Sequence, residues 1–438
     1  MLSDVRFAEP QYAAHRKYAP MTPLKRVLVN AVLSCTAFLM TAVAHADARK
    51  HVLLDTLAPE SSDVPNSADD YPQADFGAAI AVQGETALIG MPTSQSPSKV
   101  LESGRVGVFT YSNNQWHRTG TLFASKPTQY AHFGRSIVLQ GDTALIGSNT
   151  SVFVFRRLNG TWHQVQKVNA PSSDGVTKYP VAMAMYSDTA VVSAFAGTEG
   201  FVYVYQLQSN GLLKWSARVR SPTADPSEEF ASAVDTDRGW LVVGAPSKLI
   251  GPQNAGAAYV FHRVNGQWRF IQKIIPNNGG VGDRFGASVA MDNYTIVVGA
   301  PYHDPEFDNE ALTGAGGAAY VYIAHGGPFV ESAVLRPTGE ENPGYATFGE
   351  QVAITSDRII ASASHLEADY PHYPDRFVFT YIRYSALNEV LGVASGLIEG
   401  EGMAVDQHQL FVGDRGTDAY SGGAIGAVKI FDLVHRLP

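Results

Sequence analysis

A two-strand pattern that recurs along almost the whole sequence is the feature that most constrains this chain. In its clearest copy, residues 285–289 (Phe-Gly-Ala-Ser-Val) alternate large and small side chains, and a polar break at 292–293 (Asp-Asn) precedes the β-branched run 295–298. Alternation with period two indicates a half-buried strand, and a short β-branched run between turn signals indicates a buried one. Pro301 ends the second strand, because proline has no N–H to donate to a sheet. The copy is therefore a hairpin that needs neighbours to bury both faces.

Further copies of this hairpin give the chain seven repeats. Self-similarity at intervals of about 20–50 residues indicates a repeat architecture. Each hairpin precedes a third strand, such as 258–261 (Ala-Tyr-Val-Phe), and a polar turn then leads to a fourth, such as 268–274. Four antiparallel strands repeated seven times predict an all-β chain, a seven-bladed β-propeller of four-stranded antiparallel blades. The copies begin at Phe76, Phe133, Phe230, Phe285 and Phe348, with degenerate copies at Val181 and Gly402.

The Phe-Gly and Gly-Ala-Pro landmarks of these hairpins resemble the FG-GAP repeats of the integrin α N-terminal propeller. They resemble more closely the short bacterial FG-GAP proteins, in which Ala-Tyr-Val-Phe and a tryptophan follow each hairpin. The resemblance covers residues 74–428. It implies the propeller fold, but it does not choose among the many tasks that propellers perform.

The ends of the chain predict how the ring closes. The last repeat runs out after the strand 427–431, one strand short of a full blade. Residues 51–57 form an apolar strand pattern with no hairpin before it. We expect this N-terminal strand to complete the last blade, because closure of the ring leaves no unpaired blade face.

Residues 1–46 are predicted to be an N-terminal extension and signal peptide, and residues 47–438 the seven-bladed FG-GAP β-propeller. A basic pair at 25–26 precedes the apolar run 27–43, and 44–46 (Ala-His-Ala) form a small-x-small cleavage site. We expect translation to start at Met21 and the mature chain at Asp47. The expected location is secreted or periplasmic, with no membrane insertion after cleavage of the signal.

Composition and turn lengths exclude several classes of partner and cofactor. The only cysteine, Cys35, lies in the predicted signal peptide, so the mature chain has no thiol. The net charge of −9 disfavours nucleic acid and anionic lipid. The family resemblance implies a calcium loop, Asp-x-Asp-x-Asp-Gly-x-x-Asp, between strands one and two. Here these turns are too short, and the nearest approach, 235–239, offers only two carboxylates. We therefore expect no metal and no other cofactor.

Four tryptophans fall near the start of the fourth strand of their repeats, and we predict that they are packing residues. Recurrence at one place in a repeat is typical of a residue that the fold itself requires. The four are Trp116, Trp162, Trp215 and Trp268.

Two long loops, residues 302–317 in the fifth repeat and 365–375 in the sixth, carry the residues that no strand pattern requires. In a propeller, the loops from strand two to strand three and those from strand four to the next blade emerge on one face. Loops on a rigid scaffold concentrate binding residues, and aromatic rings beside carboxylates suit sugar rings. The alternative is a solvated loop rich in turn-forming Asp, Asn and Pro. The candidate ligand-binding residues are Tyr302, His303, Asp304, Asp308, Tyr370, His372, Tyr373 and Asp375.

These observations favour a monomeric, non-catalytic binding or adhesion module that uses its loop-rich face to bind a protein or a surface ligand. One alternative is a carbohydrate-binding, lectin-like protein that uses the same two loops. Another is a carbohydrate-active enzyme with an acid and base pair among Asp304, Asp308, Glu367 and Asp375. The sequence contains none of the zinc, phosphate-loop or nucleophile-elbow motifs, so we predict that the chain is not an enzyme.

Overall fold

The computed structural model describes most of the second of two units into which the chain divides, Met1–Asp47 and Ala48–Pro438. The described residues are 52–59, 75–223, 225–250, 255–303, 316–336, 347–365, 375–384, 389–392, 402–406, 409–414 and 427–433. The predicted signal peptide and the cleavage site before Asp47 lie outside them. None of the helical turns in the described part has the length and apolar character needed to cross a membrane.

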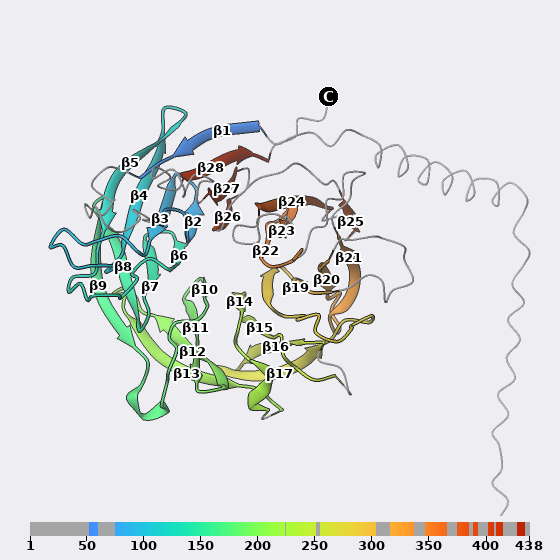
Figure 1. Ribbon diagram of the computed structural model, residues 1–438. Helices are drawn as coiled ribbons and strands as arrows, with labels where there is room; N and C mark the ends of the chain where they lie inside the picture. The colour runs from blue at the N-terminus through green and yellow to red at the C-terminus, as the bar shows by residue number, and fades with distance from the viewer. Residues whose placement is uncertain are drawn as a thin grey trace, which may run out of the picture. The chain divides into compact units, whose positions relative to one another are not determined.

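Seven four-stranded antiparallel sheets form the blades of a β-propeller, which confirms the predicted fold class. In each blade neighbouring strands pair in order, and the first strand of each blade lies toward the centre of the ring while the fourth lies at its rim (Figure 1). The pairing follows from the sequence pattern, because short turns join strands one to two and three to four.

The first four blades have the following strands. Blade 1 contains β2 (Ile80–Gln83), β3 (Thr86–Met91), β4 (Arg105–Ser112) and β5 (Gln115–Leu122). Blade 2 contains β6 (Ser136–Gln140), β7 (Thr143–Gly147), β8 (Ser151–Leu158) and β9 (Thr161–Asn169). Blade 3 contains β10 (Met183–Tyr186), β11 (Thr189–Ala196), β12 (Glu199–Leu207) and β13 (Leu213–Arg220). Blade 4 contains β14 (Val234–Asp237), β15 (Trp240–Ala245), β16 (Ala257–Val264) and β17 (Gln267–Ile274).

The remaining blades repeat this order, and two 3-10 turns precede blades 3 and 4. Blade 5 contains β18 (Ser288–Asp292), β19 (Thr295–Ala300), β20 (Ala318–Ile323) and β21 (Val330–Leu335). Blade 6 contains β22 (Val352–Ile354), β23 (Arg358–His365), β24 (Asp375–Tyr384) and β25 (Glu389–Gly392). Blade 7 contains β26 (Met403–Asp406), β27 (Gln409–Asp414), β28 (Ala427–Asp432) and β1 (Val52–Leu57). The 3-10 turns are η2 (Ser172–Asp174) and η3 (Pro226–Glu228).

The N-terminal strand closes the ring, as the sequence predicts. β1 pairs antiparallel with β28 and becomes the outer strand of blade 7. The closure continues into blade 1, because the Trp116 ring meets Phe411 edge-on at 5.2 Å, and its indole N–H donates to Gln409 Oε1 at 3.3 Å. Both ends of the propeller unit are thus held in one blade.

The Phe-Gly landmark is explained by packing between blades. Phe285 is fully buried and packs with Val242 and Val260 of blade 4 as well as with residues of its own blade. Gly286 has φ +96°, a conformation that favours glycine, and its N–H donates to Gly299 O at 2.9 Å. A Cβ on Gly244 of blade 4 would lie 2.0 Å from Gly286 O, so glycine is required there too. The repeated glycines therefore let consecutive blades approach each other.

The turns that join strands one and two share one face, which we call the turn face. In four blades the last side chain of the first strand accepts a hydrogen bond from a backbone N–H in the corresponding turn of the next blade. Gln140 Oε1 accepts from Ser187 N at 2.7 Å, and Gln140 Nε2 donates back to Ser187 O at 2.7 Å. The equivalent pairs are Gln83 with Gly141, Asp237 with Asn293, and Asp406 with Gly84. These contacts fasten four of the blades to the next one near the centre of the ring.

Candidate functional site

The opposite face, which we call the loop face, carries the loops from strand two to strand three and the connections from strand four to the next blade. Tyr203, Tyr259 and Tyr320 occupy equivalent positions in the third strands of blades 3, 4 and 5 and are fully buried. Each hydroxyl donates to a side chain of the connection that precedes its blade. The tyrosines therefore hold the loop face to the blades beneath it.

In blade 3, the partner of Tyr203 is Asp174 in the 3-10 turn η2. Arg218 on β13 donates from Nη1 to Asp174 Oδ1 at 2.7 Å. The hydrogen bond from Tyr203, with the Arg218 charge, holds the pKa of Asp174 below its usual value. Burial, together with the Asp174 carboxylate, raises the pKa of Tyr203 well above its usual value, so its hydroxyl stays protonated. The connection between blades 2 and 3 is thus fixed by the contacts that the Asp174 carboxylate makes with the Tyr203 hydroxyl and the Arg218 guanidinium.

In blade 4, Glu228 of η3 takes the same place and is fully buried. Tyr259 donates to Glu228 Oε2 at 2.8 Å, and Lys248 Nζ lies 3.1 Å from the same oxygen and 3.1 Å from Asp225 Oδ2. Burial lowers the pKa of Lys248, but its hydrogen bonds to Glu228 and Asp225 outweigh this effect and leave the pKa raised. Burial also raises the pKa of Tyr259 to about 12. A charged pair is therefore enclosed under this part of the loop face.

In blade 5, the candidate residue His303 lies in the interior, only 1% exposed. Its Nδ1 is 2.7 Å from Asp283 Oδ2, its Nε2 is 3.2 Å from Arg336 Nη2, and its ring meets Tyr320 edge-on. Because an arginine can only donate, Nε2 accepts and the ring proton sits on Nδ1, directed at Asp283. His303 is thus placed as a buried anchor of its loop.

The other sequence candidates separate into two groups. Tyr302 is 55% exposed beside the buried His303, and Asp375 begins β24, where its backbone pairs with His365. The remaining candidates lie outside the described residues: Asp304, Asp308, Tyr370, His372 and Tyr373. The set as a whole stays a prediction, in which the described part brings together only Tyr302 and His303.

Trp215 contradicts the prediction that four tryptophans pack at one equivalent position. In blades 1, 2 and 4 the tryptophan occupies one equivalent position. It pairs with the residue of its blade's third strand that lies two places after the last buried aromatic side chain of that strand. These tryptophans are Trp116, Trp162 and Trp268. In blade 3 the longer turn 208–212 moves Leu213 into that position, where it is buried, and Trp215 follows two residues later. Trp215 is consequently 56% exposed. The sequence prediction was wrong for this tryptophan because it did not account for turn length.

Trp215 lines a groove of about 500 Å3 between β13 and the connection from blade 2. The other lining side chains that matter chemically are Tyr203, Asp174, Arg218 and Arg220. Arg218 lies over the Phe201 ring at 5.5 Å, and Arg220 Nε donates to the exposed Glu199 at 3.2 Å. An exposed aromatic ring, two guanidinium groups and a carboxylate therefore meet in one hollow, which is the composition of a polar ligand site.

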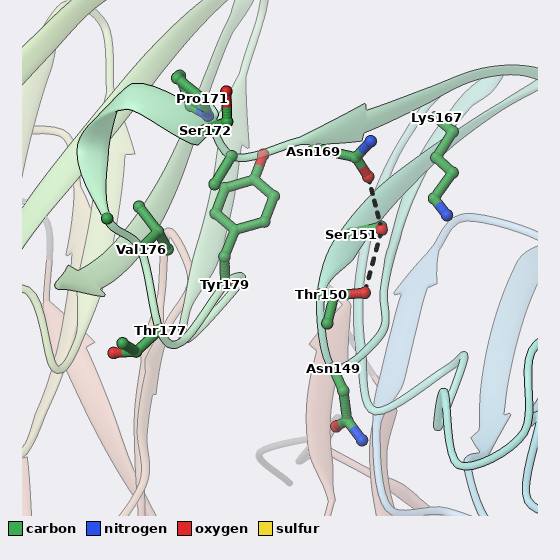
Figure 2. Close-up of a pocket in the computed structure, with 12 residues that line it drawn as sticks. Asn149, Thr150, Ser151, Lys167, Asn169, Pro171, Ser172, Val176, Thr177 and Tyr179 are labelled. Carbon is green, nitrogen blue, oxygen red and sulfur yellow. Dashed lines mark hydrogen bonds between the residues drawn. The ribbon is translucent and has the colours of Figure 1, made fainter. Parts of the chain in front are cut away.

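A second hollow of about 360 Å3 lies on the other side of the same connection, and Pro171 lines both. Figure 2 shows Asn149, Ser151, Lys167 and Asn169 along one wall of this hollow and Pro171, Val176 and Tyr179 along the other. Ser151 Oγ donates to Asn169 Oδ1 at 2.8 Å. The Lys167 ammonium lies 5.4 Å from the centre of the Phe153 ring. The second hollow thus has one wall of polar side chains, with one cation at its edge.

Neither hollow has the chemistry of a metal centre. Within the described ranges, no group of three or more His, Cys, Asp or Glu side chains is placed to hold a metal ion. The sequence predicts the ligand site in the loops of blades 5 and 6, because their composition is unusual, and that site stays a prediction. The groove of blade 3 carries a signal of its own: β13 contains Lys214, Arg218 and Arg220 with a tryptophan and no acidic residue, in a chain of net charge −9.

Comparison with known protein families identifies one of the repeats. Residues 268–322 match the model of the FG-GAP repeat. These residues run from β17 of blade 4 through the first three strands of blade 5. No curated protein matches the sequence.

Proposed function

Because the chain is an FG-GAP repeat β-propeller, we propose that it acts as a secreted or periplasmic, non-catalytic binding or adhesion module. The loop face provides the contact surface, and its ligand is a protein or a glycan of an exposed surface. The fold is compatible with such a role, since a propeller presents many loops on one rigid support. We propose that the protein works as a monomer.

The single observation that carries this proposal is the way in which the loop face is held. Buried tyrosines fix three consecutive connections, and an open groove with an exposed tryptophan lies beside one of them. Loops that are fixed before binding lose little conformational entropy when a ligand arrives. A preorganised face with an open polar groove is what a binding protein needs.

Two acidic residues of the described loop face, Asp174 and Glu228, are engaged in ways that favour a role without catalysis. Asp174 is bonded to Tyr203 and Arg218, and Glu228 is bonded to Tyr259 and Lys248. A general acid or base must reach a substrate proton, and these carboxylates instead face groups of their own blade. They are placed to hold the loops.

The test compares variants of the two faces. The loop-face variant replaces Trp215 and Tyr302 with alanine, and the control replaces Tyr186 and Tyr294, two exposed tyrosines at the turns of the opposite face. Labelled protein is bound to host cells and to their extracellular material. We expect the loop-face variant to lose at least tenfold in affinity and the control to change less than twofold.

Two results would contradict the proposed function. Equal loss in both variants, or loss only in the turn-face control, contradicts a loop-face contact. Release of product from the bound material by the unaltered protein contradicts the non-catalytic role. N-terminal sequencing of the exported protein checks the location, with Asp47 as the expected first residue.

A further inference from the structure

The groove of blade 3 contains an exposed aromatic ring that is placed to serve as a ligand platform. Trp215 and Phe270 occupy equivalent positions, since they pair with Tyr205 and Phe261 in their blades. Both side chains are exposed, and Trp215 lines the groove. The hollow exists because residues 171–174 of the preceding connection stand opposite Trp215. A flat apolar ring that lines a groove beside charged groups is suited to the C–H face of a sugar ring.

The walls of the groove offer more hydrogen-bond donors than acceptors. Arg218 donates from Nη1 to Asp174, and Arg220 donates from Nε to Glu199. Each guanidinium has five N–H donors, so these contacts engage only part of the donors of each arginine. Arg220 and Glu199 are both exposed, so their ion pair is weak and exchangeable. The Asp174 oxygens already accept from Tyr203, Arg218 and Ser173. The groove therefore favours a ligand that brings acceptors and a negative charge.

We propose that this groove binds a carboxylated sugar residue of an acidic oligosaccharide. The sugar ring stacks on Trp215, and its carboxylate pairs with Arg220, whose planar guanidinium suits a two-point contact. Arg218 is held over Phe201 and by Asp174, so it presents its remaining N–H groups in a fixed direction. The inference rests on the proposed binding function and names the ligand class of one site on it.

The mixture of charges in the groove favours a uronate over a phosphate chain. Asp174 lies on the wall of the groove, and its carboxylate would repel the denser charge of a nucleic acid backbone. Sugar hydroxyls, by contrast, can both donate and accept at such a wall. The second hollow, with Lys167 at its edge, lies across the connection and shares Pro171 with the groove, so a neighbouring sugar unit would meet a further cation there. Oligomers of uronate, which can span both hollows, are therefore the probes that fit this proposal.

The experiment measures binding by isothermal titration calorimetry. The probes are oligomers of galacturonate, glucuronate and mannuronate, the same oligomers after reduction of their carboxyl groups, and a single-stranded oligonucleotide. We expect at least one uronate oligomer to bind, its reduced form to bind at least tenfold more weakly, and rising salt to weaken the binding. Trp215→Ala and Arg220→Gln should each weaken it at least tenfold.

Phe270→Ala supplies the matched control, because Phe270 is exposed at the same position of the next blade and should change affinity less than twofold. Far-ultraviolet circular dichroism checks that each variant is folded. Equal binding of charged and reduced oligomers overturns the proposal, as does tighter binding of the oligonucleotide. Failure of every uronate to bind also overturns it. If loop-face variants still lose binding to cells in that case, the proposed function stands and only the ligand class is wrong.

Discussion

The two faces of the propeller are built from the same seven repeats but are fixed in different ways. On the turn face, a glutamine or aspartate at the end of the first strand bonds to the backbone of the next blade in four of the blades. On the loop face, buried tyrosines hold the connections before blades 3, 4 and 5 to the blade that follows, with charged groups added in blades 3 and 4. The turn face joins blades to one another, so its turns stay short and alike. The loops need only local support, which leaves them able to differ and to carry recognition.

The largest effect should follow from breaking the buried charge under the loop face. Lys248→Met leaves the fully buried Glu228 without its ammonium partner, and removal of one partner of a buried pair costs about 3–5 kcal/mol. Urea unfolding should show this loss in the free energy of unfolding. The second change Glu228→Gln, made in the Lys248→Met background, should restore much of it.

The neighbouring pair Arg284 and Glu229 gives a control at the same distance of 3.1 Å, but with both side chains exposed. Arg284→Met should cost less than about 1 kcal/mol, as exposed ion pairs do. Equal losses in the two variants would show that burial of Glu228 does not set the strength of the contact.

The contact between blades 4 and 5 should make the stability of the fold depend on pH. Desolvation between blades 4 and 5 raises the pKa of Asp235 to about 7, against the lowering effect of hydrogen bonds from Met291 N and Thr236 N. The nearby carboxylates Asp237 and Asp292 add to the rise. The folded state then binds a proton that the unfolded state releases, so stability is gained as pH falls and lost as pH rises through 7.

Between pH 8 and pH 6, this group alone should raise the free energy of unfolding by about 1.4 kcal/mol. Asp235→Asn should remove that part of the pH dependence while keeping an acceptor for Met291 N. Denaturant unfolding at a series of pH values measures it. A variant with the same pH slope as the unaltered protein would assign the slope to other groups.

A smaller effect is expected from a single contact between blades. Gln140→Ala removes both hydrogen bonds to Ser187 at an exposed site, which should cost about 1 kcal/mol. Gln115, an exposed glutamine at the start of β5, serves as the control and should change stability by less than about 0.5 kcal/mol. Thermal unfolding of the two variants compares them directly. Similar midpoints would mean that the turn face does not depend on this contact.

Particular residues show how far the sequence could predict this molecule. Phe285, Gly286 and the strand pattern predicted the blades, because packing between blades dictates residue type at those positions. Residues 51–57 predicted the closure, since the last repeat lacks a strand. Such features are local or periodic, and one sequence is enough to reveal them.

The loop face could be predicted as a surface but not in its details. In the sequence, His303 lies in a loop whose composition suggests ligand binding. In the fold it is bonded to Asp283 and Arg336, which come from two connections that lie apart in the sequence. Trp215 has the appearance of a packing residue, because its shift depends on the longer turn 208–212. Charged contacts between distant segments leave no period in the sequence, so pattern reasoning cannot find them.

The smallest effect on stability should come from replacement of Trp215. This variant tests whether the tryptophan serves ligand binding and not packing. Trp215→Ala removes an exposed ring and should change the free energy of unfolding by less than about 0.5 kcal/mol. Trp116→Ala, in a blade where the tryptophan is 6% exposed and packs on Phe411, should cost about 3–5 kcal/mol. Denaturant unfolding measures both. A loss at Trp215 as large as that at Trp116 would place the ring in the core and remove the platform on which the blade 3 groove depends.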